Sequence, residues 1–335
     1  FYKGHCLILR FPTHRSSHTT LITMKKVVIA WLFWAMISGC SPTSDPDLLP
    51  VNLNKSDQER LLLFYLGGYA APEGQDPIKA GILVKDGTSF FIRKSALKAV
   101  SPDAAAQLPA DKMDWNGLKS WVGATYNRAR NIPISLSSFL QQVAYKQGFK
   151  LSVSGVMTTA IRDVYVPESA LRAALASYKE NGKKLLYPVG TTFVGEHREE
   201  GNWVETTIMK KRRDGFWDYW VYNQAGNLAE QTLAKPQSLK SPVQCVGCHF
   251  GSRQFEPHKS FPNPAPLGAN GTKRELYLNG KVVPAALITY FKEHAKRSDT
   301  ILGPYATLFV SGLLEKRQIG TASEADLSLI KSLGL

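Results

Sequence analysis

The five residues from 245 to 249, Cys-Val-Gly-Cys-His, combine two thiols and an imidazole at the spacing that covalent haem attachment needs. Cys245 and Cys248 are separated by two residues, which lets their thiols reach the two vinyl groups of one haem. His249 follows directly, so its imidazole can bind the iron as the proximal ligand. The motif therefore predicts one covalently bound haem c, with Cys245 and Cys248 as attachment residues and His249 as metal ligand.

Two other chemistries use a Cys-x-x-Cys pair, and the surrounding sequence argues against both. A thioredoxin-like redox pair opens a helix inside a βαβ unit, and no such unit is indicated here. A structural zinc site needs a second pair of ligands at metal spacing. The chain has four cysteines, and the other two, Cys6 and Cys40, lie in the leader and in an export signal. Covalent haem is therefore the favoured chemistry.

Electron-transfer cytochromes c usually have a Met after the haem motif as the distal ligand of the iron. This chain has no Met after Met209, so that ligand is not indicated. Met209 itself lies on an expected strand and is interpreted as core. His258 is a candidate distal ligand, and His294 is a further one. His197 follows a strand and is expected to be solvated. The iron is therefore expected to be five-coordinate, with an open face that suits binding or conversion of a small ligand.

The N-terminal residues have the pattern of an export signal. Residues 1–23 are expected to be upstream sequence from a start placed too early, and residues 24–39 to be a signal peptide. Its apolar run is short for a membrane-spanning helix. Cys40 follows Ser-Gly and resembles the lipobox of bacterial lipoproteins, which implies lipidation at Cys40. Ser41 stands where an inner-membrane retention Asp would lie, which favours a periplasm-facing anchor in the outer membrane.

The net charge and the expected export of the protein together limit the partners that it can have. The formal net charge of +14 can suit nucleic acid, but an exported protein does not meet it, so we interpret the charge as a basic solvated surface. The expected partners are the membrane through the lipid at Cys40, a redox partner protein and a small-molecule ligand.

Turn residues and apolar periodicity divide the mature chain into four parts: a tether (40–54), an N-terminal region of unknown role (55–150), a haem domain (151–255) and a C-terminal segment of loop and helices (256–335). In the N-terminal region, a capping box at 56–59 predicts a helix that Gly67-Gly68 weakens at its end. Asp86-Gly87 predicts a hairpin, and 134–147 predicts a helix.

The haem domain changes to a strand pattern after a helix expected over 167–178. Three strand-like runs follow at 191–196, 203–210 and 217–222, with Gly-containing turns between them. Such short connections favour an antiparallel meander. The expected fold is α+β, an antiparallel sheet with flanking helices that enclose the haem, preceded by a smaller mixed N-terminal region. Beyond the motif we expect a hairpin at Asn279-Gly280 and helices near 284–297 and 323–333.

The last of these strands is rich in aromatic residues, which alternate between its two faces. Trp220 and Tyr222 share one face, and Trp217 and Tyr219 share the other. Either set can contact a haem or belong to the core. Asp218 shares the face of Trp220 and is a candidate polar group near a ligand.

Five segments occur in order ahead of the haem motif, over about residues 155–255: Val164-Tyr165-Val166-Pro167, the helix to Gly182, Tyr187 to Val194, Thr206 to Lys211 and Gly215 to Tyr222. This arrangement resembles the cytochrome P-460 family, which includes the cytochromes c-prime-beta. The resemblance implies an antiparallel sheet packed over the haem, aromatic side chains in the pocket and a five-coordinate, His-ligated iron. Family members oxidise hydroxylamine or bind nitric oxide.

The family's enzymes carry a bond between a Lys and the haem edge, for which Lys183 and Lys184 are the candidates here, although their spacing is stretched. Both are also interpretable as exposed cations at a helix end. The expected function is an exported monohaem cytochrome acting in periplasmic redox chemistry on a small nitrogen species such as hydroxylamine or nitric oxide. The alternative is a non-enzymatic electron-transfer or gas-binding protein with His258 as sixth ligand. Whether the chain is a haem oxidoreductase stays open.

Overall fold

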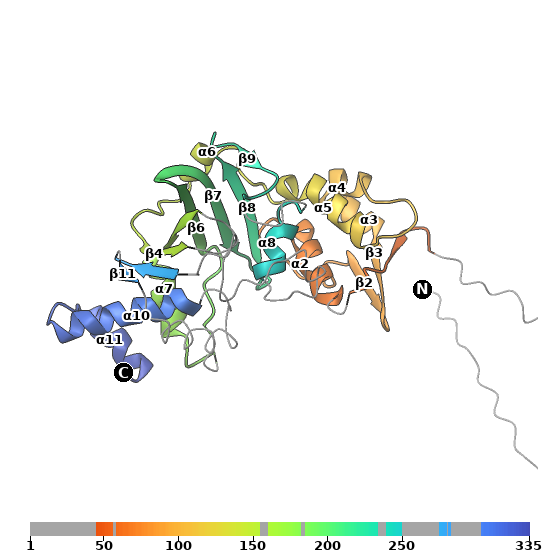
Figure 1. Cartoon of the computed structure of the whole chain (residues 1–335). Coiled ribbons are helices and arrows are strands. Elements are labelled where there is room, and N and C mark those ends of the chain that lie inside the picture. The colour runs from red at the N-terminus through yellow and green to blue at the C-terminus, as the bar shows by residue number, and fades with distance from the viewer. Residues whose placement is uncertain are drawn as a thin grey trace, which may run out of the picture. The chain divides into compact units, whose positions relative to one another are not determined.

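The computed structural model describes residues 45–55, 58–154, 160–181, 185–233, 239–249, 275–279, 281–282 and 303–335. Residues Pro46 to Leu335 belong to one compact unit, and Figure 1 labels its helices and strands. Within the described ranges, no helix is long and apolar enough to cross a membrane.

A small sheet begins the described chain. Its strands β1 (Leu48–Val51), β2 (Leu83–Asp86) and β3 (Ser89–Arg93) pair antiparallel in the order β1-β3-β2. The hairpin predicted at Asp86-Gly87 is confirmed. Gly87 takes a φ of 56°, a left-handed conformation that glycine adopts without strain.

Helix α2 (Gln58–Ala70) runs through Gly67 and Gly68, although two adjacent glycines predict a weakened end. Both glycines are buried against charged side chains from other segments, which explains why the helix continues. The helices α3 (Lys94–Val100), α4 (Pro102–Ala106), α5 (Trp115–Ala129) and α6 (Leu136–Leu140) follow. The helix expected over 134–147 is therefore confined to the short α6.

The main sheet has the order β11-β10-β4-β5-β6-β7-β8-β9 among the described strands, with antiparallel pairing throughout. Its strands are β4 (Phe149–Ser154), β5 (Ile161–Val166), β6 (Thr192–Glu199), β7 (Asn202–Lys211), β8 (Trp217–Asn223), β9 (Leu228–Ala229), β10 (Glu275–Leu278) and β11 (Lys281–Val282). The predicted meander is confirmed as β6, β7 and β8. Gly201 and Gly215, which follow β6 and β7, both have positive φ.

The segment after the haem motif contributes to this sheet. Strands β10 and β11 form a hairpin around Asn279, and β10 pairs along β4 with Leu276 opposite Val153. Helix α11 (Glu324–Leu333) confirms the helix expected near 323–333, and α10 (Gly303–Gln318) adds one that the pattern did not indicate. The helix expected near 284–297 lies outside the described residues.

The two faces of the main sheet are covered by different parts of the chain. On one face, Phe139 of α6 packs edge-on against Trp220, and Tyr145 donates a 2.5 Å hydrogen bond to Glu196. On the other face, α10 packs Tyr305 against Phe193. The N-terminal region therefore forms a direct layer on the sheet, and the predicted α+β class is confirmed. Enclosure of a haem stays a prediction.

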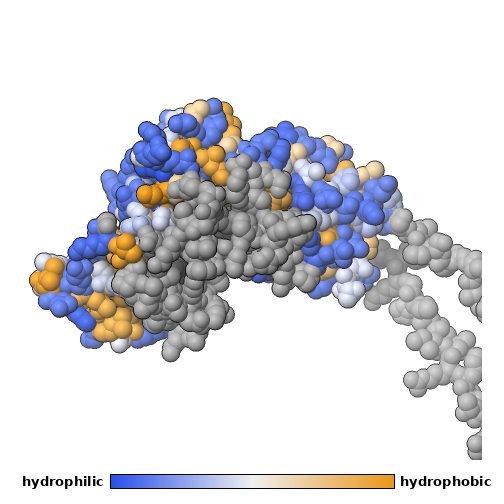
Figure 2. Space-filling model, viewed as in Figure 1, coloured by the Kyte–Doolittle hydropathy of each residue, from blue (hydrophilic) through white to orange (hydrophobic). Residues whose placement is uncertain are grey.

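Helices α10 and α11 are held to the sheet through α7 (Glu168–Ala176), because Arg172 pairs with Asp326 of α11. Phe309 of α10 packs against Phe149 of β4. Other apolar residues here are exposed, including Ile319 just after α10 and Leu327 of α11, and Figure 2 shows apolar surface over these helices. The pair therefore divides its apolar residues between core and surface.

Candidate functional site

The Cys-x-x-Cys-His residues lie in helix α8 (Val243–His249). Positions 248 and 249 follow position 245 by three and four residues, about one helical turn, so the backbone places the three positions on one side of the helix. The thiol of Cys245 is partly exposed and packs against the core, while Val246 is buried on the inner side. The side chains of Cys248 and His249 lie outside what the structure describes.

Helix α8 is anchored to the end of the main sheet by the residues at its start. Ser241 N donates to Glu230 O at 2.7 Å, and Ser241 Oγ donates to Tyr219 O of β8 at 3.4 Å. Gln244 Oε1 accepts from Thr232 N at 2.9 Å, and its Nε2 donates back to Thr232 O at 3.4 Å. Four hydrogen bonds thus fix the helix that carries the motif.

The motif residues fit a covalently attached haem, and the surrounding sheet differs from that of a thioredoxin-like site. A thioredoxin-like site needs parallel strands around the helix, whereas every pair in the main sheet is antiparallel among the strands described. Zinc needs a second set of ligands, and the described side chains, which do not include those of Cys248 and His249, contain no group of three His, Cys, Asp or Glu residues that could hold a metal. The donor set of the motif itself is two thiols and one imidazole on one helix.

A buried polar cluster lies on the adjoining strands β6 and β7. His197 Nδ1 lies 2.9 Å from Glu205 Oε1, and His197 Nε2 lies 3.1 Å from Thr207 Oγ1. Leu233 N donates to the second oxygen of Glu205 at 2.8 Å. His197 is only 2% exposed, so the prediction that it is solvated is wrong. Strand β6 extends beyond Glu196, and its pleat turns His197 inward, directly opposite Glu205.

The hydrogen-bond partners of His197 define its protonation state. Nδ1 lies beside a carboxylate oxygen, so we assign the proton to Nδ1. Thr207 Oγ1 lies within hydrogen-bond distance of both His197 Nε2 and Gly195 O. Burial lowers the pKa of His197 below its ordinary value of 6.5, against the opposing effect of Glu205. This His197 cluster (His197, Glu205 and Thr207) therefore holds a neutral base beside the half-buried residue Thr207.

The lowered pKa of His197 predicts a pH-dependent stability. The unfolded chain binds a proton at about pH 6.5 while the folded chain resists it, so stability is present above that pH and is lost as the pH falls below it. We expect urea unfolding at about pH 5.5 to give a lower free energy than at about pH 7.5, and His197→Gln to reduce that difference. An unchanged difference in the variant would show that other groups carry the effect.

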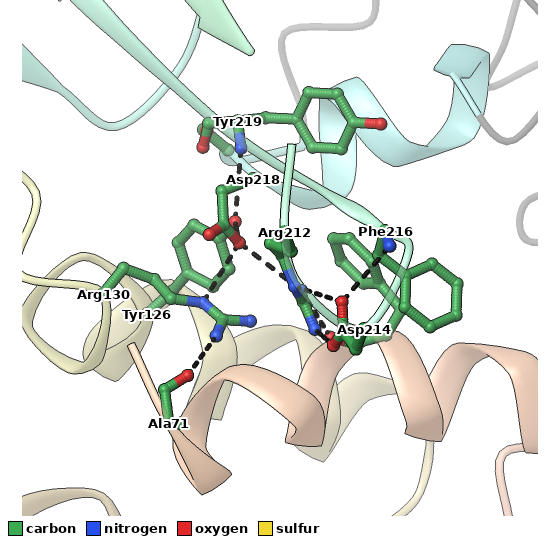
Figure 3. Close-up of polar contacts among 10 residues, drawn as sticks. Ala71, Tyr126, Arg130, Arg212, Asp214, Phe216, Asp218 and Tyr219 are labelled. Atoms are coloured by element: carbon green, nitrogen blue, oxygen red, sulfur yellow. Dashed lines mark hydrogen bonds and ion pairs between the residues drawn. The ribbon is translucent and has the colours of Figure 1, made fainter. Parts of the chain in front are cut away.

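A buried ionic cluster joins the β7–β8 turn to helices α2 and α5, as Figure 3 shows. Asp218 Oδ1 lies 3.1 Å from Arg130 Nε and 3.4 Å from Arg212 Nη1, and accepts from Tyr126 Oη at 2.8 Å. Arg212 also pairs with Asp214. Asp218, which the strand pattern offers as a polar group near a ligand, is thus paired within this cluster.

The two glycines of α2 make room for this ionic cluster. A Cβ at Gly67 would lie 2.5 Å from Asp214 Oδ2 and 2.7 Å from Arg212 Nη2. A Cβ at Gly68 would coincide with the guanidinium group of Arg130. The backbone of α2 contributes too, because Arg212 Nη1 donates to Phe64 O at 2.9 Å. The Gly-Gly pair is therefore a site of close approach between helix and arginine.

The aromatic strand β8 packs on both sides. Trp217 contacts Tyr187 and Phe193 edge-on, at centroid distances of 6.0 and 5.5 Å. Trp220 Nε1 donates to Tyr222 Oη at 3.1 Å on the opposite face. Most of these aromatic side chains pack in the core. The backbone of Tyr219 also contacts the start of α8, because its carbonyl oxygen accepts a hydrogen bond from Ser241.

Several predicted site residues lie outside the described residues: Cys40, Lys183, Lys184, His258 and His294. Met209 is partly buried on β7 and packs against the core, as predicted. The structure brings Ser241 and Gln244, at the start of the motif helix, into contact with β8 and the 230–232 segment.

Sequence reasoning missed the His197 cluster and the ionic cluster. In the sequence of a single strand, polar residues that point into the core cannot be distinguished from polar residues that face solvent. The signal that could reveal them is register, which sets His197 opposite Glu205 across a two-residue turn. For the ionic cluster, the only local signal is the Gly-Gly pair inside an apolar helix.

No protein-family model matches the chain, and neither does any curated protein sequence.

Proposed function

We propose that the chain is an exported monohaem c-type cytochrome of the P-460 type, in which Cys245 and Cys248 hold one haem and His249 is the proximal ligand. The observation that carries this proposal is the motif on one side of α8, with a partly exposed thiol at Cys245. The antiparallel sheet that anchors α8 supports it. The bound haem would supply redox chemistry and a binding position for a small ligand.

The chain's own contribution to reactions of hydroxylamine or nitric oxide is proton handling. Oxidation of hydroxylamine releases protons, and His197 Nε2 can take one through the Thr207 hydroxyl, with Glu205 stabilising the resulting charge. The His197 cluster is linked to α8, because Gln244 holds Thr232 and the next residue donates to Glu205. Hydrogen bonds thus connect the His197 cluster to the helix that carries the motif.

A pyridine haemochrome assay tests haem attachment. The full chain is produced in a host that matures c-type cytochromes, and the haem is quantified after extraction with acidified solvent. We expect haem to stay with the protein at one per chain. A chain that stays haem-free, in a host that loads a control cytochrome, contradicts the proposal.

Ferric and ferrous absorption spectra test the coordination. We expect a high-spin, five-coordinate iron that binds nitric oxide. A low-spin spectrum that His258→Ala converts to high-spin would favour the electron carrier with His258 as sixth ligand. A strongly red-shifted ferrous Soret band would indicate a lysine bond to the haem edge, and would assign it to Lys183 or Lys184 if one alanine variant removes the shift.

The lipid anchor is a separate proposal with its own prediction. Cys40→Ala removes the thiol that would carry the lipid, so the protein should leave the membrane fraction and appear with periplasmic proteins. Fractionation followed by immunoblotting measures this, with Cys40 unaltered as the reference. Unchanged partitioning into the outer membrane would refute lipidation while leaving haem attachment untouched.

A further inference from the structure

A continuous series of contacts runs from helix α5 to the haem-motif helix. Tyr126 is 1% exposed, and its hydroxyl donates to Asp218 Oδ1 at 2.8 Å while accepting from Tyr219 N at 3.2 Å. Figure 3 shows this hydroxyl between the Asp218 side chain and the β8 backbone. One side chain of the N-terminal region therefore satisfies two polar groups of β8.

Tyr219 of β8 also contacts the residues at the start of α8. Tyr219 O accepts from Ser241 Oγ at 3.4 Å, and Pro242 O accepts from Cys245 N at 3.0 Å. Tyr126, Tyr219, Ser241 and Cys245 thus follow one another through hydrogen bonds and short stretches of backbone. The peptide groups on either side of Tyr219 are held from the N-terminal region and from the motif helix.

The ionic cluster makes this arrangement rigid. Asp218 is held by Arg130 and Arg212, both of which are at most 7% exposed. Burial raises the pKa of Tyr126 well above its ordinary value of 10.0, and the charge of Asp218 raises it further, so the hydroxyl keeps its proton and donates at all physiological pH values. A fixed donor between a paired carboxylate and a strand has little freedom to move.

We infer that Tyr126 is a positioning residue for the haem-motif helix, and that the N-terminal region thereby tunes the haem site. The inference rests on the proposed function for its redox consequence. Without the hydroxyl, Tyr219 N is left without this acceptor, and the strand segment that contacts Ser241 is free to shift. The environment of Cys245, and of the haem bound there, changes with it.

Tyr69→Phe is a matched control for Tyr126→Phe. The Tyr69 hydroxyl is also buried, and it pairs with Thr125 Oγ1 at 2.6 Å, which joins helices α2 and α5. Both variants remove one buried hydroxyl from the same layer, so both cost some stability. Only Tyr126 contacts β8. Ser241→Ala removes the hydrogen bond from Ser241 Oγ to Tyr219 O, and its effect should have the same direction as that of Tyr126→Phe.

The test measures the midpoint potential of the haem-loaded full chain and its ferrous spectrum. We expect Tyr126→Phe and Ser241→Ala to shift the potential, and Tyr69→Phe to keep the wild-type value. A change of about fivefold in the redox equilibrium constant is what one lost hydrogen bond allows. Wild-type potentials in all three variants, or equal shifts in all three, would overturn the inference.

A second measurement separates this inference from the proposed function. In the haem-free full chain, the alkylation rate of the Cys245 thiol reports the position of α8 directly. We expect Tyr126→Phe to raise that rate about fivefold relative to Tyr69→Phe. If the wild type accepts no haem, the proposed function fails and the alkylation rates still decide whether Tyr126 positions α8. Equal rates in the two variants would overturn the inference.

Discussion

Replacing Cys245 and Cys248 together by alanine is expected to abolish covalent haem, because no other pair of thiols in the chain has the spacing of two vinyl groups. The double variant should show no haem-dependent peroxidase stain after denaturing electrophoresis, whereas the wild type stains at the mass of the chain. The loss should be complete, since non-covalent haem is removed by the denaturant. Stability should fall as well, because a covalently held haem contributes to the folded state.

Cys40→Ala is the matched control for this prediction. It also exchanges a cysteine for alanine, but at the position expected to carry lipid. It should change membrane partitioning and keep the haem stain. A double variant that stains like the wild type would mean that the haem, if present, is attached elsewhere.

Gly68→Ala is expected to be the most destabilising single substitution in the N-terminal region. The new methyl group would occupy the place of the Arg130 guanidinium, so the arginine must leave its buried position beside Asp218. Removing one partner of a buried ion pair costs about 3–5 kcal/mol, because the other charge is left uncompensated. Urea unfolding should therefore show a much lower free energy of unfolding.

Gly123→Ala provides the comparison. Gly123 lies inside helix α5, and a Cβ there would meet only Lys240 Cδ at an ordinary 3.7 Å. In a helix interior, alanine is favoured over glycine by about 1 kcal/mol, so this variant should be neutral or slightly more stable. If Gly68→Ala were as mild as Gly123→Ala, the ionic cluster would not depend on close approach to α2.

The parts of the fold that the sequence predicts are those with local signals. Strands β6, β7 and β8 are rich in β-branched and aromatic residues and are separated by turns whose glycines, Gly201 and Gly215, adopt positive φ. Helix α11 carries its own capping box at Ser323, with Asp326 completing it. Such signals lie within a few residues of the structure they determine.

The parts that the sequence does not predict depend on contacts between distant segments. Tyr126 and Asp218 are 92 residues apart, and nothing near either residue indicates the other. The pairing of β10 with β4 is a tertiary contact of the same kind. His197 is a case between the two, because its inward position follows from strand length and register, neither of which a short polar run reveals.

The chemistry of the candidate site stays a prediction from the motif, whereas its surroundings are known only from the structure. Two cysteines and a histidine at fixed spacing indicate haem attachment wherever they lie in the fold. The anchoring of α8 through Ser241 and Gln244 needs the sheet to be present first. The same is true of the neutral base formed by His197, which needs Glu205 from the next strand.

The most direct test of haem attachment at Cys245 and Cys248 is mass spectrometry of the denatured mature chain, expressed with a complete c-type maturation system. The result we predict is one added haem per chain, located by proteolysis to the peptide that contains both cysteines. A chain with no added mass, beside a control cytochrome that is fully loaded in the same cells, would contradict the proposed function.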